Sequence, residues 1–368
     1  MPHDGVEARF KARAFIATDR DDADCGVHEE RRFEPTTRAL TISRAAARAP
    51  NRVTAEGCYD HGVQRNVKRN ITALLTGLVV SACAASPPAE SPQEVKIVTW
   101  NVLRGFLDGT QVEPAQRWLR DEAPDVVALQ EVNGFTEARL REAAKAWGHG
   151  FAVMAKESGY PVALTSASPI EVIDRRLQGM HHGYLHARTA GLDVVVVHLH
   201  PGDWRFRRRE VANLEPLVRR LVNAGREVVV LGDFNAHHPL DCAHLDNQAA
   251  LLSRRARGKN LIEQRTFDYG VLARFSAAGV ADAAYYLLGE SAASSGTYPT
   301  RVLGHAKTAD EQSRFLERID FVLLSHAAMS RVEDVALPRG GPLDEVSDHY
   351  PVIVTLAPRT EAAASQRR

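Results

Sequence analysis

The sequence predicts an α/β fold in which two β-sheets pack face to face and helices cover their outer faces. Two features of the sequence lead to this prediction. Several expected strands are almost wholly apolar, for example at 194–197 and 228–231, and strands of this kind are covered on both faces. Stretches with helical periodicity are interspersed among the strands, and tight hairpins are few. Two packed sheets with helices outside would bury all of these strands.

The individual elements follow from the spacing of apolar residues between residues 94 and 357. The expected strands lie at 95–102, 125–132, 151–155, 160–165, 185–189, 193–200, 227–231, 319–325 and 351–356. The expected helices lie at 114–123, 136–147, 207–223 and 282–288. Ala190-Gly191 marks the turn of a hairpin, and Gly225 ends the third helix. The rest of residues 240–316 shows no single pattern.

The first part of the chain differs from this domain. Residues 1–66 mix charges, Ala and Arg without a sustained helical or strand period, so we expect disorder there. Residues 67–83 have the order of a secretory signal, with a basic start, an apolar run and small residues before a cleavage point. The apolar run is too short to span a bilayer comfortably. The alternative is a short buried helix after a disordered arm.

The end of this signal, VSAC at 80–83, resembles a bacterial lipoprotein signal. In that family the cysteine becomes the lipid-bearing first residue of the mature chain, so Cys83 is the expected lipid anchor. Residues 84–93 would then be a flexible tether rich in Pro and Ser. Because such a signal is unusual so deep in a chain, we interpret residues 1–66 as a mis-annotated extension. Residues 358–368 are expected to form a flexible tail.

Charge and cysteine content limit the classes of function. Lys and Arg total 46, as do Asp and Glu, so the formal net charge is zero. No strong field draws the whole molecule to nucleic acid or to an anionic membrane, although a local basic patch would suffice for a polyanion. Only Cys242 of the four cysteines lies in the expected domain, which excludes a disulfide framework there. We expect a buried or partly buried thiol.

Polar side chains stand at the ends of the expected strands in a recurring way. They are Asn101, Glu131, His198, Asp233, Asn235, Asp320, Asp348 and His349. A two-layer sheet places such strand ends along one rim, where a cleft could hold them together. Oxygen donors of this kind suit Mg²⁺ or Mn²⁺ rather than Zn²⁺, and such a cation neutralises phosphate charge. A carboxylate can take a proton from the attacking water, and a charged histidine can stabilise the transition state.

Six segments resemble, in order, the motifs of the endonuclease/exonuclease/phosphatase superfamily. They are TWNVLRG (99–105), ALQEV (128–132), VHLHP (197–201), GDFNA (232–236), RIDFVL (318–323) and SDHYPV (347–352). The resemblance covers residues 94–357 and implies that they form a catalytic domain with a four-layered α/β/β/α sandwich, in which helices flank two packed mixed sheets. It also implies a metal-dependent phosphoester hydrolase, either a phosphodiesterase or a phosphomonoesterase.

The resemblance implies a set of residues around the metal. Glu131 corresponds to the direct metal ligand, and Asn101 lies beside it. Asp348 supports the metal or a second position. The implied cofactor is Mg²⁺ or Mn²⁺.

The resemblance also implies the catalytic residues. Asp233 corresponds to the carboxylate that activates water or stabilises the transition state, and Asn235 to the amide that orients the phosphate. His349 corresponds to the catalytic histidine, which Asp320 orients and charges. His198 corresponds to a second histidine in contact with the phosphate.

Two positions narrow the branch of the superfamily. Abasic-site endonucleases carry an aspartate at the position of Leu103 and a tyrosine at the position of His198. This sequence therefore departs from that branch at both positions. The pattern is closer to the phosphatase, sphingomyelinase and deoxyribonuclease branches. The loops that bind the substrate decide among these branches, since the core motifs are shared.

Three further residues are candidates for substrate binding. His200 shares a strand face with His198, so it either contacts the substrate or holds the loop at Pro201. Trp204 and Arg205 follow in an arginine-rich and aromatic stretch that could grip an anionic or planar group. The alternative is a solvated first helical turn with Trp204 in the core.

Three functions remain open. The first is a secreted or membrane-anchored phosphodiesterase or phosphomonoesterase acting on a small molecule, a lipid headgroup or a nucleic acid. The second is a secreted nuclease, and the third is a non-catalytic binding module that kept the fold. The expected location is a bacterial envelope, or otherwise the periplasm or the exterior. No obligate protein partner is inferred.

Overall fold

The computed structural model describes residues 93–245, 251–252, 261–262 and 266–359. The predicted extension at 1–66, the predicted signal with Cys83 and the predicted tether up to residue 92 lie outside the described residues. The predicted tail lies outside them from residue 360 onward. None of the described helices is long and apolar enough to cross a membrane.

Two six-stranded sheets form the centre of the domain. Sheet A has the order β11 (Val332–Ala336), β12 (Val352–Leu356), β1 (Val95–Asn101), β2 (Val126–Gln130), β4 (Ala163–Ser166) and β3 (Phe151–Met154). Sheet B has the order β5 (Glu171–Arg176), β6 (Tyr184–Thr189), β7 (Leu192–His198), β8 (Val228–Asp233), β10 (Asp320–Ser325) and β9 (Val280–Asp282). Each sheet is mixed, because β1 runs parallel to β2 and β7 runs parallel to β8 among otherwise antiparallel neighbours.

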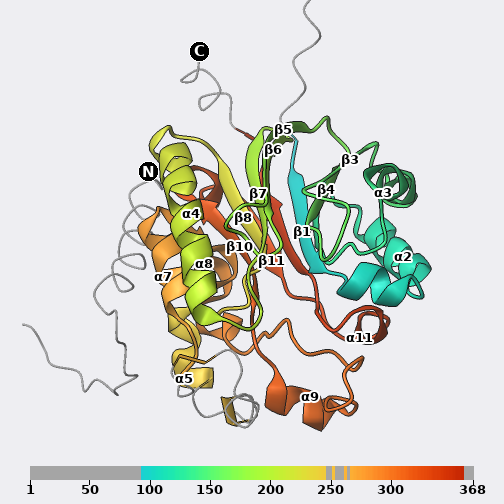
Figure 1. Ribbon diagram of the computed structural model, residues 1–368, viewed down its shortest axis with the longest axis vertical. Coiled ribbons are helices and arrows are strands. Elements are labelled where there is room, and N and C mark those ends of the chain that lie inside the picture. The colour runs from blue at the N-terminus through green and yellow to red at the C-terminus, as the bar shows by residue number, and fades with distance from the viewer. Residues whose placement is uncertain (1–92, 246–250, 253–260, 263–265, 360–368) are drawn as a thin grey trace, which may run out of the picture. The chain divides into compact units, whose positions relative to one another are not determined.

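Helices cover the outer face of each sheet. Helices α2 (Val112–Glu122) and α3 (Glu137–Ala144) pack outside sheet A, and α4 (Trp204–Asn223) and α7 (Gly270–Ala277) pack outside sheet B. Figure 1 shows these two pairs on opposite sides of the strands. The predicted four-layered sandwich is therefore confirmed.

The remaining helical segments are short and lie mainly in the connections. They are η1 (Leu103–Leu107), η2 (Lys145–Trp147), η3 (Pro239–Asp241), α5 (Cys242–Leu245), α8 (Ala283–Leu288), η4 (Gly289–Ala292), α9 (Ala309–Phe315), α10 (His326–Met329) and α11 (Leu343–Val346). Cys242 is a half-buried free thiol, as predicted.

Alternation along the strands explains why they are apolar on both faces. In β1, Ile97 joins the core between the sheets, whereas Val98 and Trp100 join the core under α2 and α3. In β8, Val229 joins the core between the sheets and Val230 the core under α4. Because each strand side is covered, burial of apolar surface stabilises all four layers together.

The sequence located the long elements and missed several short ones. The predicted hairpin is present, and its turn residues Ala190 and Gly191 have φ angles of 49° and 75°. The predicted helix at 282–288 is α8, which Asp282 caps with its side chain. Strands β5, β9 and β11 and helices α7 and α9 were not predicted. β5 is half-buried or exposed throughout, so it lacks the apolar signal of an interior strand.

One glycine in a predicted motif meets a steric requirement of sheet B. Gly232 in β8 has a φ of 138°, and a Cβ atom added there would lie 2.0 Å from the carbonyl oxygen of Val197. Val197 lies opposite Gly232 in the neighbouring parallel strand β7. No side chain fits at this position, because a backbone atom cannot move aside without breaking the ladder.

We therefore expect Gly232→Ala to lower the free energy of unfolding by about 3 kcal/mol or more. Gly225→Ala is the matched control, because Gly225 also has a positive φ of 66° but open space around it. The free energy of unfolding of the control variant should fall by only about 1–2 kcal/mol. Urea unfolding followed by circular dichroism measures both values, and equal losses in the two variants would contradict the steric account.

Candidate active site

The strand registers bring the predicted polar residues to one edge of the two sheets. His198 lies opposite Asp233 at the ends of the parallel strands β7 and β8. Asp320, the first residue of β10, pairs with the same Asp233 from the other side. In sheet A, Asn101 lies opposite Gln130, the residue before Glu131. The strand registers therefore place the polar groups of each sheet together at one end of its strands.

The segment before β12 reaches the same edge. Val352 lies opposite Thr99 in antiparallel register, so the residues before β12 pass the end of β1. Ser347 Oγ donates a hydrogen bond to the carbonyl oxygen of Asn101 over 2.6 Å, and Trp100 Nε1 donates to the carbonyl oxygen of His349 over 2.9 Å. These two bonds fasten the segment that carries the predicted Asp348 and His349.

Asn101 connects the polar groups of sheet A with those of sheet B. Its side chain is fully buried. The amide nitrogen Nδ2 donates to Asp233 Oδ2 over 3.0 Å and to Glu131 Oε1 over 3.3 Å. The amide oxygen Oδ1 accepts from the backbone N–H of Leu103 over 3.1 Å. A single carboxamide thus fixes two carboxylates relative to each other.

Asp233 lies at the centre of this group. Burial raises the pKa of its carboxyl group to about 7, and the charge of Asp320 adds to the rise. The charge of His349 and the hydrogen bonds from Asn235 and Asn101 oppose it. A carboxylate with a pKa near the working pH is suited to exchange a proton with a reacting group.

His349 and Asp320 form a buried hydrogen-bonded pair. His349 Nδ1 lies 2.8 Å from Asp320 Oδ2, and its Nε2 lies 3.9 Å from Asp233 Oδ2. Burial alone would lower the pKa of His349, but the charges of Asp320, Asp348 and Asp233 outweigh it and raise the pKa well above the usual value. The imidazole is therefore a cation at neutral pH, and it points its Nε2 side toward Asp233.

His198, unlike His349, is uncharged at neutral pH. Its Nε2 lies 3.4 Å from Asp233 Oδ2, and its ring stacks on His182 with 4.0 Å between centroids and an interplanar angle of 18°. Burial lowers the pKa of His198 well below the usual value, and the positive charge of His349 nearby lowers it further. Asp233 is thus flanked by one cationic and one neutral imidazole.

Glu131 and Asp348 supply the oxygen donors that suit a hard cation. Glu131 Oε2 accepts from the backbone N–H of Arg104 over 3.1 Å. Burial raises the pKa of Glu131, and the charge of Asp348 raises it further. Asp348 Oδ1 is buried and has no hydrogen-bond partner among the described residues. Two neighbouring carboxylates, one with an unsatisfied oxygen, fit Mg²⁺ or Mn²⁺.

A second group of potential ligand atoms lies beside them. Atoms of Asp233, Asp320 and His349 all lie within 4.8 Å of one another. This trio is a weaker candidate for a cation, because Nδ1 of His349 is bonded to Asp320 and a protonated imidazole has no lone pair to donate to a metal. Its geometry instead suits charge stabilisation and proton transfer.

Backbone conformation aims two of the site residues. Glu131 has a φ of 60° and Asn235 a φ of 47°, both in the left-handed region that non-glycine residues rarely occupy. Asn235 Nδ2 donates to the carbonyl oxygen of Leu199 over 3.2 Å, which holds the amide beside β7. Such conformations persist only where the surroundings impose them, and they concentrate at functional sites.

The three residues predicted to contact the substrate, His200, Trp204 and Arg205, lie outside the group of contacts around Asp233. His200 Nδ1 accepts the backbone N–H groups of Gly202 and Asp203, each over 2.9 Å, so it holds the loop after β7. Trp204 is half-buried rather than in the core, and the guanidinium of Arg205 lies 4.5 Å from its ring centroid. The described ring contacts of Trp204 are with arginines of its own helix and not with Asp233.

Two further residues, His182 and Glu210, lie around these groups. His182 stacks on His198, and its own pKa falls to about 3 because it is buried and close to other basic groups. Glu210 is buried in α4 and accepts the backbone N–H groups of His181 and His200, each over 2.7 Å. The only sequence signal for Glu210 is a charge on the face of α4 that carries Val211 and Leu214.

Comparisons with known proteins agree with this architecture. Residues 98–349 match the profile of the Endonuclease/Exonuclease/phosphatase family. No curated protein matches the sequence.

Solved structures share the fold at low sequence identity. An AP endonuclease from Archaeoglobus fulgidus is 20% identical with a TM-score of 0.53, covering 71% of this chain and 99% of its own. A 3′-5′ exonuclease (NExo) from Neisseria meningitidis is 24% identical with a TM-score of 0.54, covering 72% and 100%. A 3′ phosphatase NExo variant from Neisseria, bound to a product DNA hairpin, is 23% identical with a TM-score of 0.51, covering 71% and 98%.

Glu210 should make the stability of the histidine loops depend on pH. Burial raises the pKa of its carboxyl group to about 7, although hydrogen bonds from His181 and His200 oppose the rise. A raised pKa means that the stabilising contribution is present below the unfolded pKa and is lost as pH rises through the folded value. The loss of unfolding free energy caused by Glu210→Ala should therefore be about 2 kcal/mol smaller at pH 8.5 than at pH 5.5.

Glu215→Ala is the matched control on the same helix. Hydrogen bonding to Arg219 lowers the pKa of Glu215, so it is ionised throughout this pH range. The loss of unfolding free energy caused by Glu215→Ala should therefore be the same at the two pH values. Denaturant unfolding of both variants at each pH gives the comparison, and a pH-independent effect of Glu210→Ala would show that this carboxyl group does not titrate near neutrality.

Proposed function

Because the chain belongs to the endonuclease/exonuclease/phosphatase family, we propose that it is a metal-dependent phosphoester hydrolase with its active site at the shared edge of the two sheets. The observation that carries the proposal is the buried chain of contacts from Asn101 through Asp233 to His349 and Asp320. Each of these four residues is held in place by hydrogen bonds or close ion pairs. It adjoins two carboxylates that suit a cation, and this combination serves hydrolysis of a phosphoester.

Glu131 and Asp348 are the residues that would hold the cation, with Asn101 orienting Glu131. When bound, Mg²⁺ or Mn²⁺ would neutralise charge on the phosphate and stabilise the leaving oxygen. The cation would also favour the ionised state of both carboxyl groups, whose pKa values burial otherwise raises. The electrostatics of the two carboxyl groups therefore support a cation at this site.

Four side chains of the protein take the other roles in the proposed reaction. Asp233 accepts a proton from the attacking water, because it combines a raised pKa with a fixed orientation from Asn101 and Asn235. His349, kept cationic by Asp320, stabilises negative charge that develops on the phosphoryl oxygens. His198 is neutral and offers a hydrogen bond without adding charge. Asn235 orients the phosphate.

The substrate proposal includes lipid headgroups and other small phosphoesters. It rests on the sequence features at 67–93, which predict export and a lipid anchor on Cys83. An anchored enzyme would work at a membrane surface, on phosphodiesters or phosphomonoesters close to it. His200, Trp204 and Arg205 lie on or just before the first turn of α4 and are proposed to meet the substrate outside the catalytic centre.

A nuclease is the second candidate. The solved structures of similar fold include a DNA 3′ phosphatase with product DNA and an AP endonuclease. The stretch after Asp203 places Arg205, Arg208 and Arg209 on one short segment of α4, close to aromatic rings. Such a segment could contact a nucleic-acid backbone. Cleavage of plasmid DNA in the presence of Mg²⁺ would favour this candidate over a lipid or small-molecule phosphoesterase.

Hydrolysis of bis-p-nitrophenyl phosphate tests the proposed activity. We expect turnover that EDTA abolishes and that added Mg²⁺ or Mn²⁺ restores. His349→Ala and Asp233→Ala should each lower kcat by at least about 100-fold, because each removes a group needed in the transition state. His244→Ala, in the short helix α5, is the control and should keep wild-type kcat. Wild-type rates in both active-site variants would end the proposal.

The pH profile tests the role of Asp320 separately. Removing the negative charge in Asp320→Asn should lower the pKa of His349, because Asp320 is the main group that raises it. The imidazole would then lose its proton at lower pH, so the alkaline limb of the kcat profile should move toward acid by at least about one unit. An unchanged alkaline limb with a uniformly reduced rate would instead indicate that Asp320 only supports the fold.

A further inference from the structure

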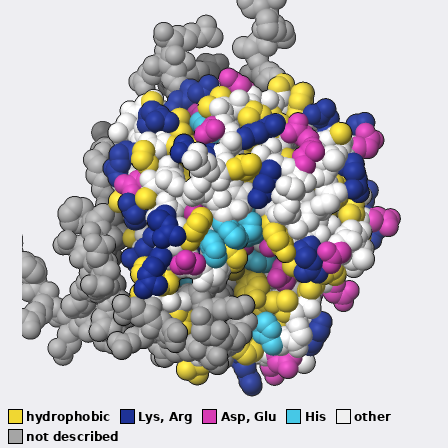
Figure 2. Space-filling model, in the orientation of Figure 1, with side chains coloured by type: hydrophobic (Ala, Val, Ile, Leu, Met, Phe, Trp, Pro, Cys, Tyr) yellow, Lys and Arg dark blue, Asp and Glu magenta, His cyan; other side chains and the backbone are white. Residues whose placement is uncertain are grey.

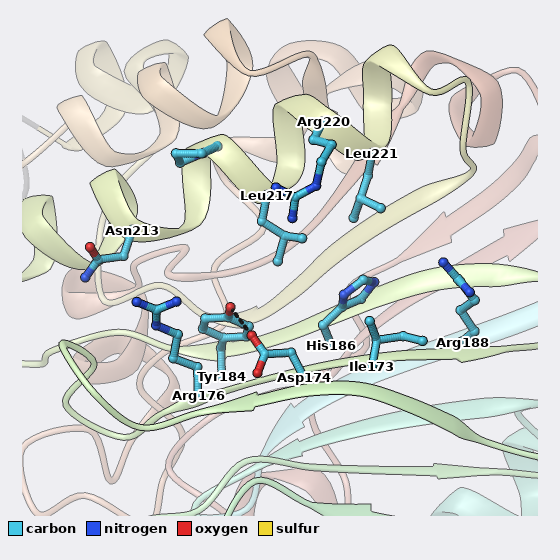
Figure 3. A pocket seen from close by; sticks show the side chains of 11 residues that line it. Ile173, Asp174, Arg176, Tyr184, His186, Arg188, Asn213, Leu217, Arg220 and Leu221 are labelled. Carbon is cyan, nitrogen blue, oxygen red and sulfur yellow. Dashed lines mark hydrogen bonds between the residues drawn. The ribbon is translucent and has the colours of Figure 1, made fainter.

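A cavity of about 370 Å³ lies on the outer side of sheet B, and none of the proposed active-site residues lines it. Figure 3 shows that its walls come from β5 and β6 on one side and from α4 on the other. The volume falls within the range of ordinary small-molecule sites. Its lining combines apolar and polar side chains, and the charged ones are mostly basic, with Arg176, Arg188 and Arg220 opposed by the single carboxylate of Asp174.

The cavity exists because α4 covers only part of sheet B. The residues of β7 and β8 under this helix are apolar, including Val195, Val197 and Val230. The outward residues of β6 are instead Tyr184, His186 and Arg188. A helix cannot pack tightly on such a polar stripe, so space remains beside its flank, where Leu217 and Leu221 form the apolar wall.

A β-bulge shapes the floor on the side of β5. The register between β5 and β6 shifts between Val172 and Asp174, which brings Asp174 opposite His186. Asp174 Oδ2 accepts a hydrogen bond from the Tyr184 hydroxyl over 2.6 Å. Bulges re-aim side chains, and they are common beside functional sites.

His186 forms part of the polar wall of the cavity. Its side chain is 2% exposed, and its Nε2 lies 2.9 Å from Asp193 Oδ1. Because a carboxylate only accepts, Nε2 carries the proton of this bond. The other ring nitrogen, Nδ1, is buried without a hydrogen-bond partner among the described residues. A buried nitrogen without a hydrogen-bond partner costs free energy.

The arginines around the cavity differ in whether they already form ion pairs with carboxylates of the protein. Arg188 is paired with Asp193 and Glu171. Arg220 takes part in no ion pair within the described part of the chain, and Figure 3 shows its guanidinium among the other lining side chains. Its neighbour Arg219 points elsewhere and bonds Glu215 over 2.8 Å. Arg176 likewise takes part in no ion pair within the described residues, so Arg176 and Arg220 are the lining cations most available to an incoming anion.

We propose that this cavity binds a phosphate group, either as inorganic phosphate or as the phosphate of a small phosphorylated molecule. The arginines supply charge-assisted donors for its negative oxygens. Leu217, Leu221 and Ile173 give an apolar surface for an organic part. This site is separate from the proposed catalytic centre and shares none of its residues.

Calorimetric titration of the metal-free full-length chain tests the proposal with three probes, which are inorganic phosphate, adenosine 5′-monophosphate and adenosine. We expect saturable binding of both phosphate-bearing probes with Kd below about 1 mM, and none of adenosine. Arg220→Ala should weaken the binding at least about tenfold, because it removes a charged donor. Tighter binding of the nucleotide than of phosphate would identify an organic phosphate as the ligand, and equal binding would identify the free anion.

Two controls make the result decisive. Arg219→Ala, one residue away on the same helix, should bind both probes like the wild type. Arg220→Ala should keep wild-type Tm and hydrolytic turnover, since Arg220 is exposed and lies outside the catalytic group. Absence of saturable binding would overturn the proposal. So would binding that survives in Arg220→Ala but is lost in His349→Ala, because the phosphate would then occupy the active site.

Discussion

The chemistry of the site depends on the burial of one carboxylate, Asp233, where the strand ends of two sheets meet. Water is excluded there, so every neighbouring charge acts through a medium of low polarity and is felt strongly. Asn101 from sheet A and His349 from the segment before β12 both approach this carboxylate, at 3.0 Å and 3.9 Å. The cores under the helices and between the sheets hold these strand ends rigidly, and the rigidity lets an unfavourable burial persist.

The same constraint sets the charge of the surrounding groups. Two histidines flank Asp233, yet the pKa of His349 is raised and that of His198 is lowered. The difference comes from their partners, since His349 bonds to Asp320 whereas His198 stacks on the neutral ring of His182. Environments that push the pKa values of like groups apart assign separate roles to them. Glu131 and Asp348 complete the pattern as carboxylates that a cation would satisfy.

Much of this arrangement could be predicted from the sequence, because the predicted site residues follow or precede strongly apolar strands. The strand registers were not predictable, and neither was the contact of His182 with His198, since both depend on long-range packing. Glu210 was missed because a buried charge inside an amphipathic helix resembles an ordinary surface residue until its two backbone partners are known. Strand β5 was missed because it is polar, and the same polarity leaves the basic cavity beside α4.

The most direct test of the account is the position of the cation. Crystals of the chain soaked in Mn²⁺ would give an anomalous difference peak at each bound ion. The account predicts a peak in contact with the carboxylates of Glu131 and Asp348, with the bond between His349 and Asp320 intact. A peak ligated instead by His349, Asp233 and Asp320, or no peak at this edge of the sheets, would contradict it.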